Sequence, residues 1–307
     1  MSVENNNEAV CPCCAACGIS EIDDIKLEEC GDCDLVRYCS DECQEDHKSE
    51  HEDACKKRAA ELRDEILFKQ PESNYLGDCP ICSLPLSIDT DKSTLMPCCS
   101  KVICDGCDHA NENREKEARL VPSCPFCREP TPESDEECDK QVMKRVEAND
   151  PAAMCQQGVK QHEKGDYRSA FDYWTKAAAL GDTDAHSKLS YLYRKAEYVQ
   201  KDEEKEVYHL EEAAIGGAPY ARYFLGWHEY DNGNIERAVK HWIIAATQGE
   251  DGSIKALMGA FRGGLISKEE LAATLRAHKA AVDATKSPQR AAAEICHQFI
   301  SSSHETK

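Results

Sequence analysis

Small and large apolar residues recur at helical spacing in the C-terminal half of the chain. The pattern is seen in three segments, each of which ends in glycine: 170–181, 206–217 and 238–249. Spacings of four and seven residues place the apolar side chains on one face of a helix. Alanines on that face allow close approach, and Trp174 and Trp242 are expected to fill the gap between neighbouring repeats.

A second apolar pattern precedes each of these segments. It begins at Ala153, Ala185 and Ala221, and a partial fourth copy begins at Ile254. Each repeat is therefore predicted to be a pair of helices. The middle copy is the weaker one, with Leu210 in the place that tryptophan holds in the other two.

Helical patterns also lie outside the repeats. Residues 56–68 carry a helical pattern of apolar residues set among charges, and Pro71 forbids its continuation, so residues 56–78 are predicted to be a helical linker. Residues 267–300 begin with a capping box, Ser267 to Glu270, and break near Pro288. They are interpreted as a helical C-terminal cap on the repeats.

The repeat pattern resembles the Sel1-like repeat, a relative of the tetratricopeptide repeat, over about residues 150–266. That resemblance implies an α-solenoid that acts as a protein-binding scaffold and carries no chemistry of its own. An irregular alanine-rich helical bundle is the alternative. The predicted fold is mainly α, with two small cysteine-rich N-terminal domains before the solenoid.

Cysteine separates the N-terminal part of the chain from the repeats. The chain has 307 residues and 20 cysteines, of which those from Cys11 to Cys127 make up all but three. This length suits two or three domains. Clustered cysteines in a reducing compartment indicate metal sites before they indicate disulfides.

The charge and the N-terminus exclude several classes of protein. A formal net charge of -21 argues against a nucleic-acid partner, which would require clustered cations. Residues 1–8 are polar and acidic, unlike a secretory signal, and no apolar run reaches the ~18 to 20 residues of a membrane span. We therefore expect an intracellular protein, cytoplasmic or nuclear, that does not associate with membranes.

The first cysteine-rich block contains eight potential ligands, enough for two tetrahedral Zn²⁺ ions. They are Cys14, Cys17, Cys30, Cys33, Cys39, Cys43, His51 and Cys55. Their spacing resembles the MYND zinc finger over residues 14–55, including the Tyr-Cys-x3-Cys-Gln core from Tyr38 to Gln44. The resemblance implies interleaved pairs: Cys14, Cys17, Cys39 and Cys43 on one ion, and Cys30, Cys33, His51 and Cys55 on the other.

Two residues of this block bear on partner binding. The resemblance makes Gln44 a candidate partner-binding residue, and His47 stands where the family commonly has a tryptophan of the peptide groove. His47 is also an alternative metal ligand. Cys11 and Cys13 are interpreted as spare thiols, with a Cys11 and Cys14 pair as the alternative.

The second block, residues 79–130, again supplies eight ligands. They are Cys79, Cys82, Cys98, Cys99, Cys104, Cys107, Cys124 and Cys127. The ends, Cys-Pro-Ile-Cys and Cys-Pro-Phe-Cys-Arg, resemble the RING finger. The cross-brace of that family implies one ion on Cys79, Cys82, Cys104 and Cys107, and a second on Cys98, Cys99, Cys124 and Cys127. Adjacent cysteines depart from the family pattern, so His109 is the alternative to one of Cys98 and Cys99. Four Zn²⁺ ions are predicted in all.

The RING resemblance also implies a function. Ile81 and Pro125 match the family positions that meet a ubiquitin-conjugating enzyme, and Arg128 matches the basic residue that contacts ubiquitin. A planar guanidinium can hold the thioester in one orientation without a covalent step. We therefore expect a RING-type E3 ubiquitin ligase that recruits protein substrates through its repeats. The alternative is a non-enzymatic zinc-finger scaffold that binds an assembly partner. Cys138, Cys155 and Cys296 are expected to be inert or partly buried thiols.

Overall fold

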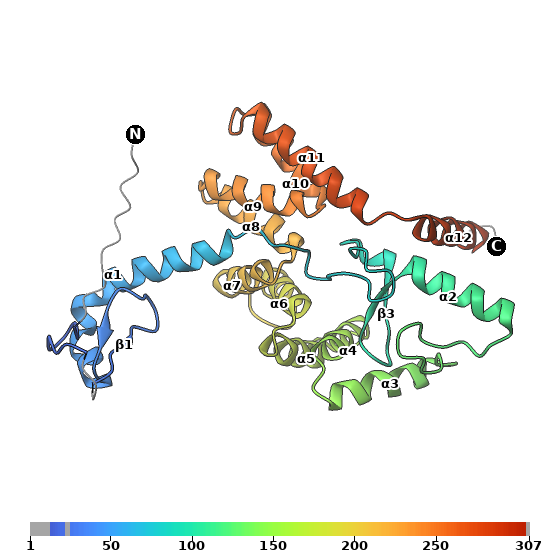
Figure 1. Ribbon diagram of the computed structural model, residues 1–307, viewed down its shortest axis with the longest axis horizontal. Helices are drawn as coiled ribbons and strands as arrows, with labels where there is room; N and C mark the ends of the chain where they lie inside the picture. The colour runs from blue at the N-terminus through green and yellow to red at the C-terminus, as the bar shows by residue number, and fades with distance from the viewer. Residues whose placement is uncertain (1–12, 22–24, 305–307) are drawn as a thin grey trace. The chain divides into compact units, whose positions relative to one another are not determined.

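A computed structural model describes residues 13–21 and 25–304, with side chains up to His297. The chain divides into two compact units, Met1–Lys69 and Gln70–Lys307. Most of the described residues are helical, and a cysteine-rich N-terminal region precedes stacked helical repeats (Figure 1). The predicted fold class is thus confirmed. In the part of the chain that the structure describes, no helix has the length and apolar character needed to cross a bilayer.

The first unit combines a short hairpin with a long helix. Strand β1 (Glu28–Glu29) pairs antiparallel with β2 (Arg37–Tyr38), and α1 covers Asp41–Leu67. The Ser40 side chain accepts a hydrogen bond from the Cys43 amide and caps the helix, whose first turn is acidic as the helix dipole favours. Residues 56–67 are thus the second part of a helix that begins inside the first cysteine-rich block.

The second cysteine-rich block opens the second unit. It contains the 3-10 turn η1 (Thr90–Lys92), strands β3 (Ser93–Leu95) and β4 (Val102–Cys104), and helix α2 (Asp105–Ala118). The strands pair antiparallel, with Ser93 opposite Cys104. Leu86, Met96 and Ile103 are buried among the cysteines, so the apolar core of this block is small.

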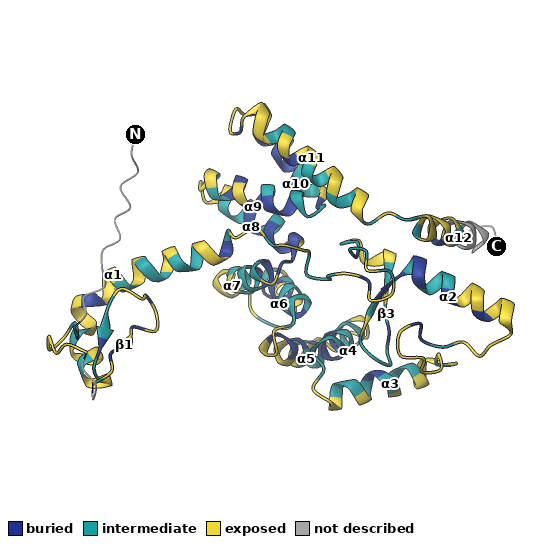
Figure 2. Ribbon diagram, in the orientation of Figure 1, coloured by how far each residue is buried: buried dark blue, intermediate teal, exposed yellow. Residues whose placement is uncertain are grey.

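The repeats form a stack of helix pairs of similar length. Their bounds are α3 Asp135–Glu147, α4 Pro151–Glu163, α5 Tyr167–Ala179, α6 Thr183–Lys195, α7 Glu203–Ile215, α8 Pro219–Asp231, α9 Ile235–Thr247 and α10 Asp251–Arg262. Helix α4 packs against α5, α6 against α7, and α8 against α9. Burial follows one face of each helix, as the sequence pattern predicts (Figure 2).

The two repeat tryptophans pack in the same way. Trp174 and Trp242 are 2% and 1% exposed, which confirms their predicted core positions. Each indole nitrogen donates to a backbone carbonyl of the preceding helix, that of Cys155 or Tyr223. Each ring also lies directly on a glycine of that helix. A Cβ atom at Gly158 would lie 2.4 Å from Trp174 Nε1, and one at Gly226 would lie 2.2 Å from Trp242 Nε1.

Residues 267–300 form two helices with different neighbours. Helix α11 (Lys268–Ala284) packs against α9 and α10, and its predicted capping box is present. Helix α12 (Pro288–His304) packs against α2 of the second cysteine-rich block. Only the first of them extends the repeat stack.

The segment after α1 also contacts the repeats. Gln70 hydrogen-bonds Thr247 at 3.1 Å, and the Ser73 carbonyl accepts from the Gln248 side chain at 3.4 Å. Burial and the nearby Asp184 carboxylate raise the pKa of the Tyr75 phenol well above its usual value. These contacts tie the start of the second cysteine-rich block to the solenoid.

Candidate metal centres

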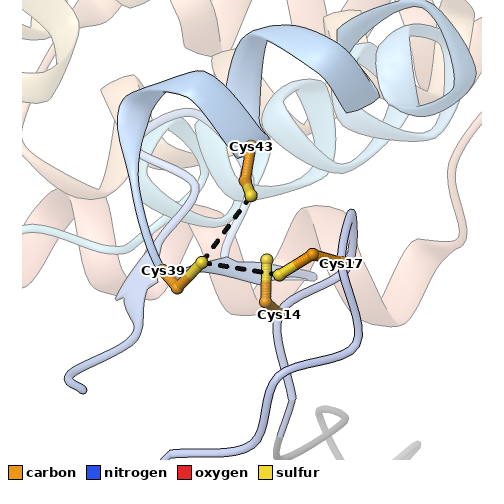
Figure 3. A group of neighbouring side chains, drawn as sticks. All are labelled: Cys14, Cys17, Cys39 and Cys43. Atoms are coloured by element: carbon orange, nitrogen blue, oxygen red, sulfur yellow. Dashed lines mark hydrogen bonds between the residues drawn. The ribbon is translucent and has the colours of Figure 1, made fainter. Parts of the chain in front are cut away.

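The first sulfur cluster consists of Cys14, Cys17, Cys39 and Cys43 (Figure 3). Two chain turns and the start of α1 bring these residues together. In the turn after Cys14, the Cys14 amide donates to Ile19 O at 2.7 Å and Gly18 adopts a left-handed φ of 74°. Cys39 Sγ lies 3.6 Å from both Cys17 Sγ and Cys43 Sγ.

The second cluster consists of Cys30, Cys33, His51 and Cys55. The two residues on α1, His51 and Cys55, are one helical turn apart. Cys30 Sγ lies 3.7 Å from Cys55 Sγ, and Cys33 Sγ lies 3.0 Å from His51 Nε2. His47, the alternative ligand, is outside this cluster: its Nδ1 bonds the Tyr38 hydroxyl at 3.1 Å and its ring stacks on His51.

The third cluster consists of Cys79, Cys82, Cys104 and Cys107. Cys79 and Cys82 lie in a turn in which the Cys79 amide donates to Leu84 O and the Ser83 amide donates to Cys79 O. Cys104 and Cys107 come from the end of β4 and the first turn of α2. The Cys82 and Cys104 sulfurs are 3.8 Å apart.

The fourth cluster consists of Cys98, Cys99, Cys124 and Cys127. Cys98 Sγ lies 3.3 Å from Cys127 Sγ, and Cys99 Sγ lies 3.9 Å from Cys124 Sγ. The sulfurs of both adjacent cysteines therefore belong to the same cluster. His109 points elsewhere and shares a 2.9 Å hydrogen bond with Asn113.

The backbone explains how adjacent cysteines can serve together. The turn from Met96 to Lys101 has the same hydrogen bonds as the turn from Cys79 to Leu84: Met96 N donates to Lys101 O, and Ser100 N donates to Met96 O. Met96 thus takes the place of the first cysteine of such a turn. Cys99 takes the place of the second cysteine. Cys98, at the tip of the turn, supplies the ligand that Met96 does not provide.

The donor sets and spacings fit zinc. A tetrahedral ion with Zn–S bonds of about 2.3 Å requires sulfur–sulfur separations of about 3.8 Å. Most of the sulfur pairs given above lie between 3.6 and 3.9 Å. Within each cluster, all four ligand atoms lie within 4.8 Å of one another. The MYND-like region and the clusters together indicate zinc binding.

The electrostatics point the same way. Burial raises the pKa of the Cys14 thiol, but amide donors of Cys17, Cys39 and Ala16 outweigh it and bring that pKa to about 6. Similar amide donors outweigh burial at Cys79 and lower its pKa to about 7. Hydrogen bonding with Cys17 and Cys43 raises the pKa of Cys39 to about 12. Four crowded thiols therefore cannot all ionise without a cation between them.

The remaining cysteines lie outside the four clusters or outside the described residues. Cys138 and Cys296 are half-buried and Cys155 is buried, where desolvation raises the pKa of its thiol. Cys13 belongs to none of the clusters, and it is disulfide-bonded, so its interpretation as a spare thiol is wrong. Cys11 lies outside the described residues.

The three candidate ubiquitin-system residues lie around one cavity of about 310 Å³ beside α2. Ile81 is 44% exposed, but Pro125 is buried. Arg128 is exposed and donates a 3.0 Å hydrogen bond to Asn111 Oδ1 on α2. Gln44 is exposed in the first turn of α1.

The sequence pattern did not lead to a second cavity, also of about 310 Å³, on the solenoid. Its walls come from α4 to α8, and Leu210 and Ser190 lie among the lining residues. Leu210 stands where the neighbouring repeats have tryptophan, and Ser190 where they have glycine. The weak middle copy of the repeat was the signal that could have located this cavity.

Comparison with protein families agrees with this division of the chain. The MYND finger matches residues 11–55, and the Sel1 repeat matches residues 152–182, 183–217 and 219–250. The chain carries a MYND finger and Sel1 repeats. The family comparison does not identify a RING finger in the second cysteine-rich block. These two modules support a zinc-binding protein that interacts with other proteins.

Solved structures of two repeat proteins are similar to part of the chain. A Sel1 repeat protein from Oxalobacter formigenes is 25% identical, with a TM-score of 0.36, over 39% of this chain and 96% of its own. The protective antigen c5321 of uropathogenic Escherichia coli, which displays an SLR fold, is 20% identical with a TM-score of 0.39, over 52% of this chain and 36% of its own. No curated protein matches the chain.

Proposed function

We propose that this chain is a zinc-stabilised adaptor that binds protein partners through the cavity at its middle repeat. The observation that carries the proposal is the replacement of the core tryptophan by Leu210. In the flanking repeats the indole ring fills the space above a glycine, as Trp174 does above Gly158. In the middle repeat the smaller leucine leaves a cavity.

The lining of this cavity suits a protein segment with a bulky apolar side chain. Trp174, Tyr191 and Phe224 supply aromatic surface, which is typical of sites that anchor a peptide. Arg194 lies 4.0 Å from the centre of the Phe224 ring, and Lys188 is also at the wall. Arg194 also lies 4.0 Å from Glu206. Although the whole chain has a net charge of -21, these two cations locally favour a partner with acidic residues beside its apolar anchor.

The test fills the cavity in the way the neighbouring repeats do. A Ser190→Gly, Leu210→Trp double variant rebuilds the glycine and tryptophan pair of the flanking repeats, so the helices should remain intact. Peptides selected from a displayed random library on the wild-type chain should share an apolar residue flanked by acidic ones, and should lose binding to this variant.

The matched control is Leu180→Trp. Leu180 is 52% exposed at the end of α5 and does not line the cavity, so this variant should bind the peptides like wild type. Selected peptides that bind all three proteins equally would refute the role of the cavity.

Zinc has a structural role in this proposal. Each of the four clusters would hold one Zn²⁺ through the four ligands named above, and the ion would cross-link distant turns of a region whose apolar core is small. A reducing compartment, the cytoplasm or the nucleus, keeps such thiolates available.

Ubiquitin ligation is a second candidate, because Ile81, Pro125 and Arg128 line one cavity. Ile81→Ala should then weaken binding of a conjugating enzyme, since it removes an apolar anchor. Arg128→Ala should leave that binding nearly unchanged and slow ubiquitin discharge. If the wild-type chain stimulates ubiquitin discharge from none of the conjugating enzymes of a broad panel, ligation is refuted and only the adaptor function remains.

A further inference from the structure

An arginine far away in the sequence reaches the third cysteine cluster. Arg290, in the first turn of α12, points its guanidinium at the turn that holds Cys82. Nη2 lies 3.5 Å from Cys82 Sγ and 3.2 Å from Leu84 O, and Nη1 donates to Pro85 O at 2.6 Å. Nη1 also donates to the carbonyl of Thr285, the C-cap residue of α11, which fixes the guanidinium to the segment that joins α11 to α12.

Helix α12 is seated closely on α2 at this point. A Cβ atom at Gly106 would lie 2.7 Å from the Arg290 amide nitrogen and 2.9 Å from its Cα, so only glycine allows this approach. Ala293, one turn further along α12, is fully buried, and Glu294 pairs with Lys92 at 3.2 Å. The contact therefore involves several residues of the helix and not the arginine alone.

The chemistry of the cluster explains what the guanidinium can do. Four thiolates around one Zn²⁺ carry a net charge of -2, and groups that donate hydrogen bonds to ligating sulfur both orient the ligand and tune its binding. Arginine donates several hydrogen bonds from one rigid plane and stays charged. From a single position it can therefore bond a ligand sulfur and two carbonyls of the ligand turn.

We propose that Arg290 is a positioning residue for the Cys79, Cys82, Cys104 and Cys107 zinc site, and that α12 is a structural part of the second zinc module. The proposal rests on zinc occupying this cluster. It assigns to the C-terminal helix a role in metal retention, in addition to any role in binding partners.

The test measures zinc release from the full-length protein into a colorimetric zinc chelator. Arg290→Met removes the charge and donors but keeps the side-chain stem. It should release one zinc equivalent at least about tenfold faster than wild type, since loss of such a hydrogen-bond partner typically weakens metal affinity by about 10- to 100-fold. Arg290→Lys keeps the charge without the planar donors and should fall between the two. Arg276→Met, at an exposed position of α11, is the matched control and should behave like wild type.

Pulse alkylation with N-ethylmaleimide followed by mass spectrometry identifies the site that opens. In Arg290→Met, the cysteines of the third cluster should be modified first. Faster alkylation of all four clusters together, with loss of the far-UV circular dichroism of the repeats, would mean general unfolding and would contradict a local role.

Gly106→Ala tests the seating of α12 without replacing the arginine, because the new methyl group would push against the Arg290 backbone. Alanine has a higher helix propensity than glycine. If α12 were not docked on α2, this substitution should therefore stabilise α2. With α12 docked, it should speed zinc release from the same cluster. Release curves of Arg290→Met and Gly106→Ala that superimpose on wild type would overturn the proposal. Wild-type protein that lacks this zinc equivalent would instead overturn the metal site itself, before any substitution is made.

Discussion

Replacing Gly226 by alanine should destabilise the solenoid, although the residue lies inside helix α8 and alanine is the better helix former. The change in helix propensity alone favours alanine by about 1 kcal/mol. However, the new methyl group would lie 2.2 Å from Nε1 and 2.5 Å from Cδ1 of Trp242. The indole is 1% exposed and its nitrogen is bonded to Tyr223 O, so the ring has little room to move.

The two effects can be weighed against each other. Overpacking of a filled core costs about 1–3 kcal/mol. Because the Cβ position lies well inside contact distance of the indole, we expect the overpacking cost to exceed the gain in propensity, with a net loss of up to about 2 kcal/mol in the free energy of unfolding. Gly259 provides the control, because it lies on an exposed part of α10 and a Cβ there would meet nothing within 4 Å. Gly259→Ala should stabilise the chain by roughly 0.5–1 kcal/mol.

A second substitution should rescue the first. Trp242→Leu alone should cost about 2 to 3 kcal/mol, because it leaves a cavity. Combined with Gly226→Ala it approximates the middle repeat, where Ser190, larger than glycine, accompanies Leu210, smaller than tryptophan, so the double variant should lose at least about 1 kcal/mol less than the sum. Urea unfolding followed by far-UV circular dichroism measures wild type, the two single variants, the double variant and the Gly259→Ala control in buffer with zinc. A stabilised Gly226→Ala, or additive losses in the double variant, would refute the close indole-on-glycine packing.

Three further predictions concern metal and pH. Elemental analysis of protein purified without chelator should find four Zn²⁺ per chain. Two or fewer would show that one of the two cysteine-rich blocks is not a zinc-binding module. Chelation should unfold the two cysteine-rich blocks and leave the repeat helices folded, since the small blocks depend on the metal; loss of most of the helical circular dichroism would contradict this. Burial, then Arg222 and Arg237, lowers the pKa of His241 from 6.5 to about 3. The stability that neutral His241 provides is therefore present above pH 6.5 and is lost as the pH falls toward 3, by up to about 1.4 kcal/mol per pH unit. The urea midpoint of wild type should fall between pH 7 and pH 5 more than that of His241→Leu, and equal falls would show that His241 does not titrate as described.

The repeats were predictable because their information is local and periodic. Trp174 and Trp242 recur at matched positions within their helices, and each ends up buried as the spacing implied. The ligand spacings were equally informative, since the structure brings the sixteen predicted ligands into the four expected groups.

Two features had no local signal. Adjacent Cys98 and Cys99 departed from the family spacing, and only the backbone turn that begins at Met96 shows how both reach one cluster. The neighbour of α12 was equally hidden. An alanine-rich helix pattern predicts a helix but not the surface that it covers, and Arg290 reads as an ordinary exposed charge until Gly106 is placed beside it. Tertiary contacts of this kind are set by shape, which the periodicity of one segment does not contain.

The contact between Arg290 and the turn of Cys82 imposes an order on biosynthesis. The last ligand of the cluster, Cys107, precedes Arg290 by 183 positions, and ribosomes add about 5–20 residues per second, so the complete ligand set exists for about 9 to 37 s before its arginine has been made. During that interval the nascent third cluster lacks the contacts that α12 supplies, while the MYND finger, which lies wholly upstream, already has all its ligands. Zinc supply during translation should therefore affect the yield of the second module more than that of the first.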